Sequence, residues 1–183
     1  MANPANRQEL NEYLRRSPQD IRLYFGELSG ILERFSLDVA LAYVFARTEL
    51  AHNMALYCGI VKIHHAHSGM ARTAIDATHL TRELFPEKFE SVFGRPLPNE
   101  VVTHLRGAEG TRDRVMHGKS TPDSAKREAI AHVIDYACRF NDVVYPIAGF
   151  RPFGNLRGFH GRGKSLPKNS TRWILKGMGF KLS

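Results

Sequence analysis

A long segment with helical spacing constrains the fold of this chain more than any other feature. The sequence Ser36-Leu37-Asp38 is typical of a helix start, and apolar residues recur after it at steps of three and four through about Ala66. The repeating positions are Leu41, Val44, Phe45, Thr48, Ala51, Ala55 and Cys58. A helix of this length needs other elements to cover its apolar face, so the segment predicts the central helix of an all-α fold.

Prolines and glycines divide the rest of the chain into further helices. We expect helices over 17–35, 69–85, 99–117 and from 121 to Pro146, with a short helix over 86–93. Ser17 and Thr121 are expected to cap two of the starts, and Gly94 and Gly118 to end two helices in the left-handed conformation. No run of alternating apolar and polar residues between hairpin turns competes with this assignment. The prediction is a bundle of four or five helices with antiparallel neighbours.

The net charge of +8 belongs to the carboxy-terminal segment. Residues 150–183 contain eight of the 26 Lys and Arg and no Asp or Glu, so the remaining 18 basic residues balance the 18 acids. The segment is also rich in glycine, and 171–176 is its only short apolar stretch. We therefore expect a helical domain over 1–148 and a basic, Gly-rich tail over 149–183 that docks a single turn or strand and is otherwise mobile.

The chain lacks the features of a membrane-spanning or exported protein. No apolar run approaches the ~20 residues that cross a bilayer, and the amino terminus has no basic start followed by an apolar stretch. A cytoplasmic protein with no membrane partner is the expectation. Cys58 and Cys138 fall on apolar helix faces, where we expect buried thiols rather than a disulfide or a metal site.

The stretch from Arg112 to Gly118 carries the most functional information. An arginine is followed directly by a polar residue, Asp113, and then, after three more residues, by His117 and a glycine. This pattern resembles the signature of the HEPN family, and it lies where one expected helix ends before the last long one. The resemblance implies a HEPN-like bundle that cleaves RNA without a metal or cofactor. It also implies a homodimer that faces two such motifs across its interface.

The residue types suit this chemistry. Metal-independent RNA cleavage needs a base for the ribose 2′-hydroxyl, an acid for the leaving 5′-oxygen, and a cation near the developing charge on phosphorus. An imidazole such as that of His117 can either accept or donate a proton, and the guanidinium of Arg112 matches phosphate oxygens. Asp113 is a candidate for orienting one of these groups, and Arg114 and Lys119 for holding flanking phosphates. One histidine cannot act as base and acid in the same step, so the second copy is part of the mechanism.

Two other pairs share the arginine-to-histidine spacing. They are Arg47 with His52 and Arg127 with His132. Both lie inside continuous amphipathic segments, and neither histidine is followed by glycine. We interpret both pairs as chance matches.

The basic tail is a second candidate for RNA contacts. Its candidate phosphate ligands are Arg151, Arg157, Arg162, Lys164 and Lys168, and Phe153, Phe159 or Trp173 are candidates for stacking on unpaired bases. Residues 158–165 formally match a phosphate-loop pattern, but no strand precedes them and Pro167 interrupts the segment where such a loop would open a helix. A nucleotide-binding loop is therefore not expected. A solvated tail without a binding role is the simpler alternative.

Other interpretations stay open from sequence alone. Residues 112–117 can equally be a solvated charged turn in which His117 stabilises a helix end, which leaves a non-catalytic HEPN module that binds RNA or protein. A DNA-binding regulator is a third class, although no helix-turn-helix pattern supports it. The resemblance places the catalytic interpretation in a toxin-antitoxin or antiviral-defence setting, with an antitoxin or defence protein as partner. The cluster His64-His65-Ala66-His67 shows no zinc spacing, and we expect no metal there.

Overall fold

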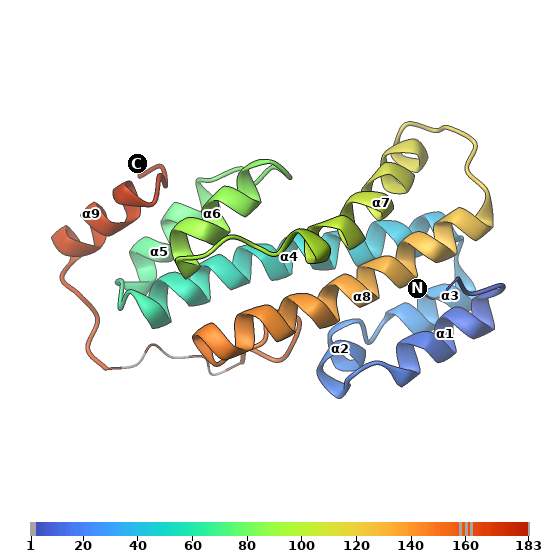
Figure 1. Cartoon of the computed structure of the whole chain (residues 1–183), viewed down its shortest axis with the longest axis horizontal. Helices are drawn as coiled ribbons and strands as arrows, with labels where there is room; N and C mark the ends of the chain where they lie inside the picture. The colour runs from blue at the N-terminus through green and yellow to red at the C-terminus, as the bar shows by residue number, and fades with distance from the viewer. Residues whose placement is uncertain (1–2, 158, 160, 162, 183) are drawn as a thin grey trace. The chain divides into compact units, whose positions relative to one another are not determined.

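The computed structural model describes residues 3–157, 159, 161 and 163–182, and these residues form helices and loops without any strand (Figure 1). The helices are α1 (Arg7–Arg16), α2 (Gln19–Tyr24), α3 (Leu28–Arg34), α4 (Leu37–Ile63), α5 (Ser68–Asp76), α6 (Leu84–Phe93), α7 (Asn99–Met116), α8 (Asp123–Ala148) and α9 (Lys168–Gly177). The all-α prediction is confirmed. None of the helices in the described part of the chain has both the length and the hydrophobicity to span a membrane.

The chain divides into two compact units. Unit 1 consists of Met1–Leu50, Pro98–Val143 and Phe153–Asn155, and unit 2 consists of Ala51–Leu97, Val144–Pro152 and Leu156–Ser183. Two of the boundaries along the chain fall inside α4 and inside α8, and none coincides with the expected division after residue 148.

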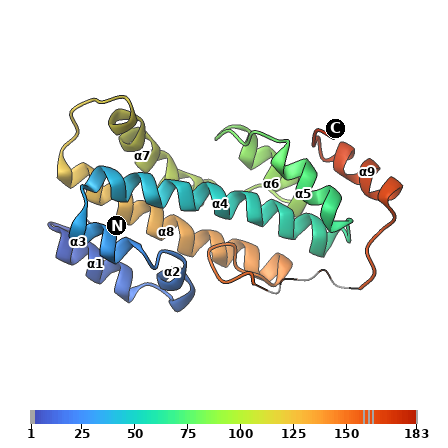
Figure 2. The same ribbon diagram turned by 180° about the vertical axis from the view of Figure 1, so that it is seen from behind.

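Unit 1 is built around the first part of α4 and most of α8. In both ribbon views these segments lie between α7 on one side and α1, α2 and α3 on the other (Figures 1 and 2). Its aromatic centre is Phe153, which is fully buried and packs edge-on against the rings of Tyr24 and Tyr136. The amide of Asn141 pairs with both backbone groups of Phe153 at 2.9 Å. Phe153 is therefore a core residue, and the expectation that it could stack on a base is wrong.

Unit 2 depends on a close approach between α4 and α6. A Cβ at Gly59 would lie 2.6 Å from Cγ1 of Val92, so only glycine lets the two helices meet at this distance. Helix α9 packs on α5 through the buried residues Thr171 and Leu175, and the His67 N–H donates to the Thr171 hydroxyl at 3.0 Å. The end of the chain thus contributes a ten-residue helix to unit 2 rather than the single turn or strand expected.

The long helices follow the sequence pattern, whereas the short ones depart from it. Segment 17–35 forms two helices, α2 and α3, instead of one, and the Ser17 hydroxyl bonds the Tyr13 carbonyl instead of capping α2. Helix α5 ends at Asp76 rather than near residue 85. Pro86 lies in the first turn of α6, where a missing backbone N–H costs no intrahelical bond.

Candidate functional site

The α7 motif, Arg112–Gly118, forms the end of α7 in unit 1. Gly118 has φ of 66°, and its N–H donates to the Val115 carbonyl at 3.0 Å. The Lys119 N–H donates to the Arg114 carbonyl at 2.8 Å. These two bonds constitute a Schellman ending, which satisfies carbonyls that the helix leaves open. The glycine signal in the sequence correctly predicted this stop.

Arg112 is fixed by two residues of α4. Its Nη2 lies 3.0 Å from Oε1 of Glu49, and its guanidinium carbon lies 5.2 Å from the centre of the Phe45 ring. The arginine side chain is 28% exposed, so these two contacts restrict the guanidinium while part of it still faces solvent. A cation oriented in this way can receive a phosphate oxygen with little reorganisation.

His117 is the capping residue at the end of α7 and is exposed. Its backbone N–H donates to the Asp113 carbonyl at 3.0 Å, and this bond holds the backbone of His117 in place. Five helical residues correspond to a rotation of about 140° around the axis, so Arg112 and His117 leave α7 in different directions. The motif of one chain therefore presents its cation and its imidazole on different sides of the helix end.

The other residues predicted for this site lie at the end of α7 and in the turn that follows it. Arg114 is exposed and donates from Nη2 to the Ser120 carbonyl at 3.1 Å, which closes the turn after α7. Lys119 is also exposed, and Asp113 is half-buried. Arg114 and Lys119 thus lie within the same exposed turn as His117, where they can add positive charge around it.

The predicted tail contacts belong to unit 2. Arg151, Arg157, Lys164 and Lys168 are all exposed, whereas Arg162 lies outside the described residues. The Arg151 guanidinium lies 4.2 Å from the centre of the Tyr145 ring, an arrangement typical of a cation–π contact. These residues thus form no part of the α7 motif, which belongs to unit 1.

The other two arginine–histidine pairs have structural contacts. Arg47 donates to the Tyr24 carbonyl at 2.9 Å, and Arg127 donates to the Pro4 carbonyl at the same distance. His52 stacks on Phe85 with ring centres 3.7 Å apart, and burial lowers its pKa to about 3. A histidine with such a pKa is a poor proton donor or acceptor at neutral pH.

The histidines at the end of α4 also make structural hydrogen bonds. His64 bonds the Val92 carbonyl through Nε2 at 2.7 Å, and the carbonyl of His65 accepts the Leu166 N–H at 2.7 Å. Within the described ranges, His, Cys, Asp and Glu side chains nowhere gather in a group of three that could hold a metal ion.

Sequence reasoning missed Glu49 and Phe45, which orient Arg112. Glu49 lies 63 residues before Arg112, and nothing in its local sequence marks it as a partner. It also missed the half-buried pair His104 and His132, whose ring centres are 6.2 Å apart. Burial lowers the pKa of His104, and the Arg139 charge lowers it further.

Comparisons of the chain with protein-family models, with curated proteins and with solved structures each gave no match.

Proposed function

We propose that this chain is a metal-independent endoribonuclease of the HEPN type, with a composite active site formed by the α7 motifs of two copies. The observation that carries the proposal is the exposed His117 at a fixed helix end, in the same motif as a guanidinium that Glu49 holds in place. The proposal includes a HEPN-like helical bundle, a cytoplasmic location and a toxin or antiviral-defence role.

The reaction we propose is an attack within the RNA strand. One imidazole removes the proton from a ribose 2′-hydroxyl, and the oxygen attacks the adjacent phosphorus. The bond to the 5′-oxygen breaks, and the second ring, which begins the step as an imidazolium, gives its proton to that leaving oxygen. The products are a 2′,3′-cyclic phosphate and a free 5′-hydroxyl. The two imidazoles are His117 of each copy, and the two Arg112 side chains stabilise the charge on the phosphoryl oxygens.

The contact with Glu49 gives Arg112 a defined place in this scheme. The carboxylate and the Phe45 ring restrict the guanidinium before substrate arrives, and the remaining N–H groups can bind phosphate. Glu49 also places a negative charge beside the site, which opposes RNA binding. Its role is therefore to position the arginine, and it does not touch the substrate.

Exposed apolar side chains on α4 support a second copy as the partner. Val39, Ala42, Ala46 and Leu50 are exposed and follow one another at steps of three and four, so they form one line along the helix, which we call the α4 stripe. Ala46 lies three residues before Glu49 and is its neighbour on the helix surface, so the α4 stripe passes beside the residue that contacts Arg112. Association of two stripes would remove this apolar surface from water and bring two motifs near each other.

The experiment is cleavage of labelled RNA in excess chelator. The wild-type chain is expected to cut, and Arg112→Ala and His117→Ala are each expected to lower the rate by at least about a hundredfold, the usual size of a lost charge-stabilising donor or a lost acid–base group. His79→Ala is a matched control because His79 is an exposed histidine of unit 2. Cleavage that survives both motif variants would reject the assignment.

A non-catalytic HEPN module is the second candidate. The observation that favours it is the Arg112–Glu49 ion pair, because an arginine already paired is less available to a phosphate. This candidate predicts RNA binding with strong salt dependence and no cleavage under any condition.

A further inference from the structure

The net positive charge of the chain belongs to unit 2. This unit contains 13 Lys and Arg against four Asp and Glu, so its formal charge is +9. Unit 1 contains 13 basic against 14 acidic residues, so its formal charge is −1. The unit that carries the α7 motif therefore contributes almost nothing to long-range attraction of a polyanion, and unit 2 contributes nearly all of it.

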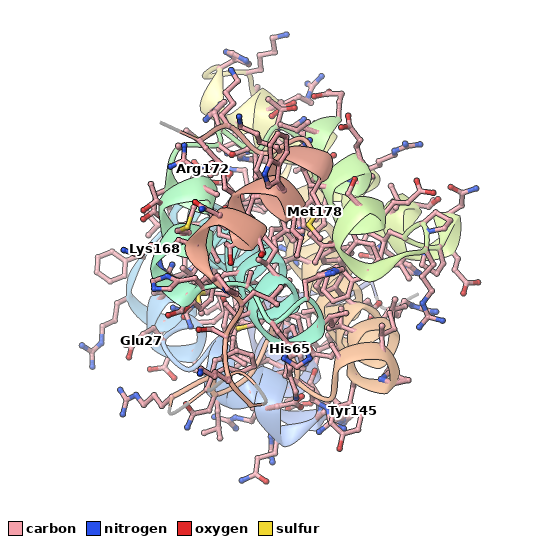
Figure 3. The ribbon with its side chains drawn as sticks, turned by 90° about the vertical axis from the view of Figure 1, so that its left-hand side faces the viewer. Glu27, His65, Tyr145, Lys168, Arg172 and Met178 are labelled. Atoms are coloured by element: carbon pink, nitrogen blue, oxygen red, sulfur yellow. The ribbon has the colours of Figure 1, made fainter. Side chains whose placement is uncertain are left out.

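Helix α9 presents a basic face to solvent. Its apolar side is used within unit 2, where Thr171, Leu175 and Met178 are buried. Its exposed residues include Lys168, Arg172 and Lys176, which follow one another at steps of four and therefore line one side of the helix about 6 Å apart along the axis. Figure 3 labels Lys168 and Arg172 on this helix. Three cations in a row match the repeating negative charge of a nucleic-acid backbone.

Trp173 lies beside this row of cations. Its side chain is 73% exposed, although tryptophan is a residue that proteins usually bury, and Lys176 Nζ lies 5.6 Å from the centre of its ring. An exposed indole flanked by cations offers a flat surface for an unpaired base and charges for the adjacent phosphates. Bases in a duplex are already stacked on each other, so this arrangement fits a single strand.

A membrane surface fits α9 less well. An interfacial helix inserts a whole apolar face into the lipid, whereas the apolar face of α9 is buried within unit 2. Trp173 is the only large apolar side chain that α9 leaves exposed, since Ile174 is half-buried and Leu175 fully buried.

We propose that the outer face of α9 is a binding site for single-stranded RNA, in which Trp173 stacks on a base and Lys168, Arg172 and Lys176 neutralise phosphates. The choice of RNA over DNA rests on the proposed nuclease function. The site serves to hold the substrate strand on unit 2, whereas the groups that cut it belong to unit 1.

Trp173 is the only tryptophan in the chain, so its fluorescence reports on this site alone. The probe is a short 2′-O-methyl oligouridylate, which has no free 2′-hydroxyl to attack and is titrated into the full-length His117→Ala chain. Stacking is expected to quench the tryptophan emission as the strand binds. Inorganic polyphosphate, which has charge but no bases, is expected to bind without this quenching. Equal quenching by both would overturn the stacking role.

Variants measured by anisotropy of a labelled strand separate the two contributions. Trp173→Ala is expected to raise the Kd about tenfold, and Trp173→Phe to restore most of the affinity. Replacing Lys168, Arg172 and Lys176 by alanine is expected to reduce the slope of log Kd against log salt by about 2. Replacing Arg15, Arg22 and Arg34 of unit 1 removes the same charge and is expected to leave that slope unchanged. Equal effects of the two triple variants would overturn the site.

The outcomes also separate this site from the nuclease and from a membrane. A blue shift of Trp173 emission with anionic phospholipid vesicles, without any quenching by the strand, would overturn the RNA site in favour of a lipid surface. Quenching in a chain that never cleaves RNA supports the α9 site and rejects only the nuclease. Cleavage that persists with unchanged strand affinity in Trp173→Ala rejects only the α9 site.

Discussion

At the end of α7, one functional side chain is held by contacts and the other is exposed. Arg112 is held against α4 by an ion pair and a ring contact, and His117 is exposed at the capping position. Since the ion pair is partly exposed, its contribution to the free energy of unfolding is small, about 1 kcal/mol or less. Its functional effect is the orientation that it gives to the guanidinium.

Replacing Glu49 tests this positioning role. Glu49→Ala is expected to lower kcat for RNA cleavage severalfold because the guanidinium loses its fixed orientation. The KM is expected to stay the same or fall, since a negative charge near the phosphate has gone. Glu49→Gln keeps an acceptor for the arginine and is expected to restore part of kcat. Equal kcat values for wild type and Glu49→Ala would exclude the positioning role.

His52 gives unit 2 a defined response to pH. His52 of the unfolded chain binds a proton near pH 6.5. In the folded chain burial lowers its pKa to about 3, so the proton binds only near that lower pH. The free energy of unfolding is therefore expected to fall as the pH drops through this interval, by up to about 1.4 kcal/mol per pH unit. Denaturant unfolding of His52→Gln is expected to show a flatter pH profile. Parallel profiles would refute this.

Helix ends that depend on neighbouring residues were predicted from the sequence, whereas those that depend on distant packing were not. Helix α4 and the glycine-terminated ends of α6 and α7 were predicted because spacing and left-handed glycines act within a few residues. The break between α5 and α6 was predicted at Pro86, but it lies at residues 77–83. Residues 77–83 contain neither glycine nor proline, and the position of α6 depends on packing against Gly59 of α4.

Alanine substitutions at two glycines measure how much free energy the close packing of α6 on α4 involves. Gly59→Ala places a Cβ 2.6 Å from Val92 and 3.0 Å from Phe93, whereas a Cβ at Gly30 of α3 meets nothing within 4 Å. Both changes gain helix propensity, so the difference between them isolates the steric effect. Gly59→Ala is expected to be less stable than Gly30→Ala by about 1–3 kcal/mol in denaturant unfolding. Similar stabilities would show that α6 can shift without cost.

The α4 stripe leads to a prediction about association. Ala46→Arg puts a long charged side chain in the middle of this apolar line and is expected to give a folded monomer in light-scattering or sedimentation measurements. Cleavage is expected to fall with the dimer, although Ala46 is not in the α7 motif. Ala77→Arg changes an exposed alanine of unit 2 and is expected to keep both properties. A dimeric, active Ala46→Arg chain would contradict the role of the stripe.

At the scale of the whole molecule, the sequence predicted the charge and the helical class but not the organisation. The sequence located the excess of basic residues at the carboxy-terminal end. It did not show what this end packs against, because α9 is positioned by contacts with α5 about 100 residues earlier in the chain. Phe153 is likewise buried by residues of helices that are distant in sequence. The candidate residues of the α7 motif came from local sequence, and their orientation came from α4.

If two copies of the α7 motif act together, mixing wild-type chain with an inactive variant must lower the activity of each wild-type chain. Wild-type chain is equilibrated with increasing amounts of His117→Ala chain, and cleavage of labelled RNA is followed in chelator. A mixed dimer has one imidazole where base and acid need two, so the rate per wild-type molecule is expected to fall in proportion to the fraction of wild-type chains in the mixture. A rate per wild-type molecule that stays constant as the variant is added, or no cleavage by the wild-type chain at all, would exclude a nuclease site shared between two copies.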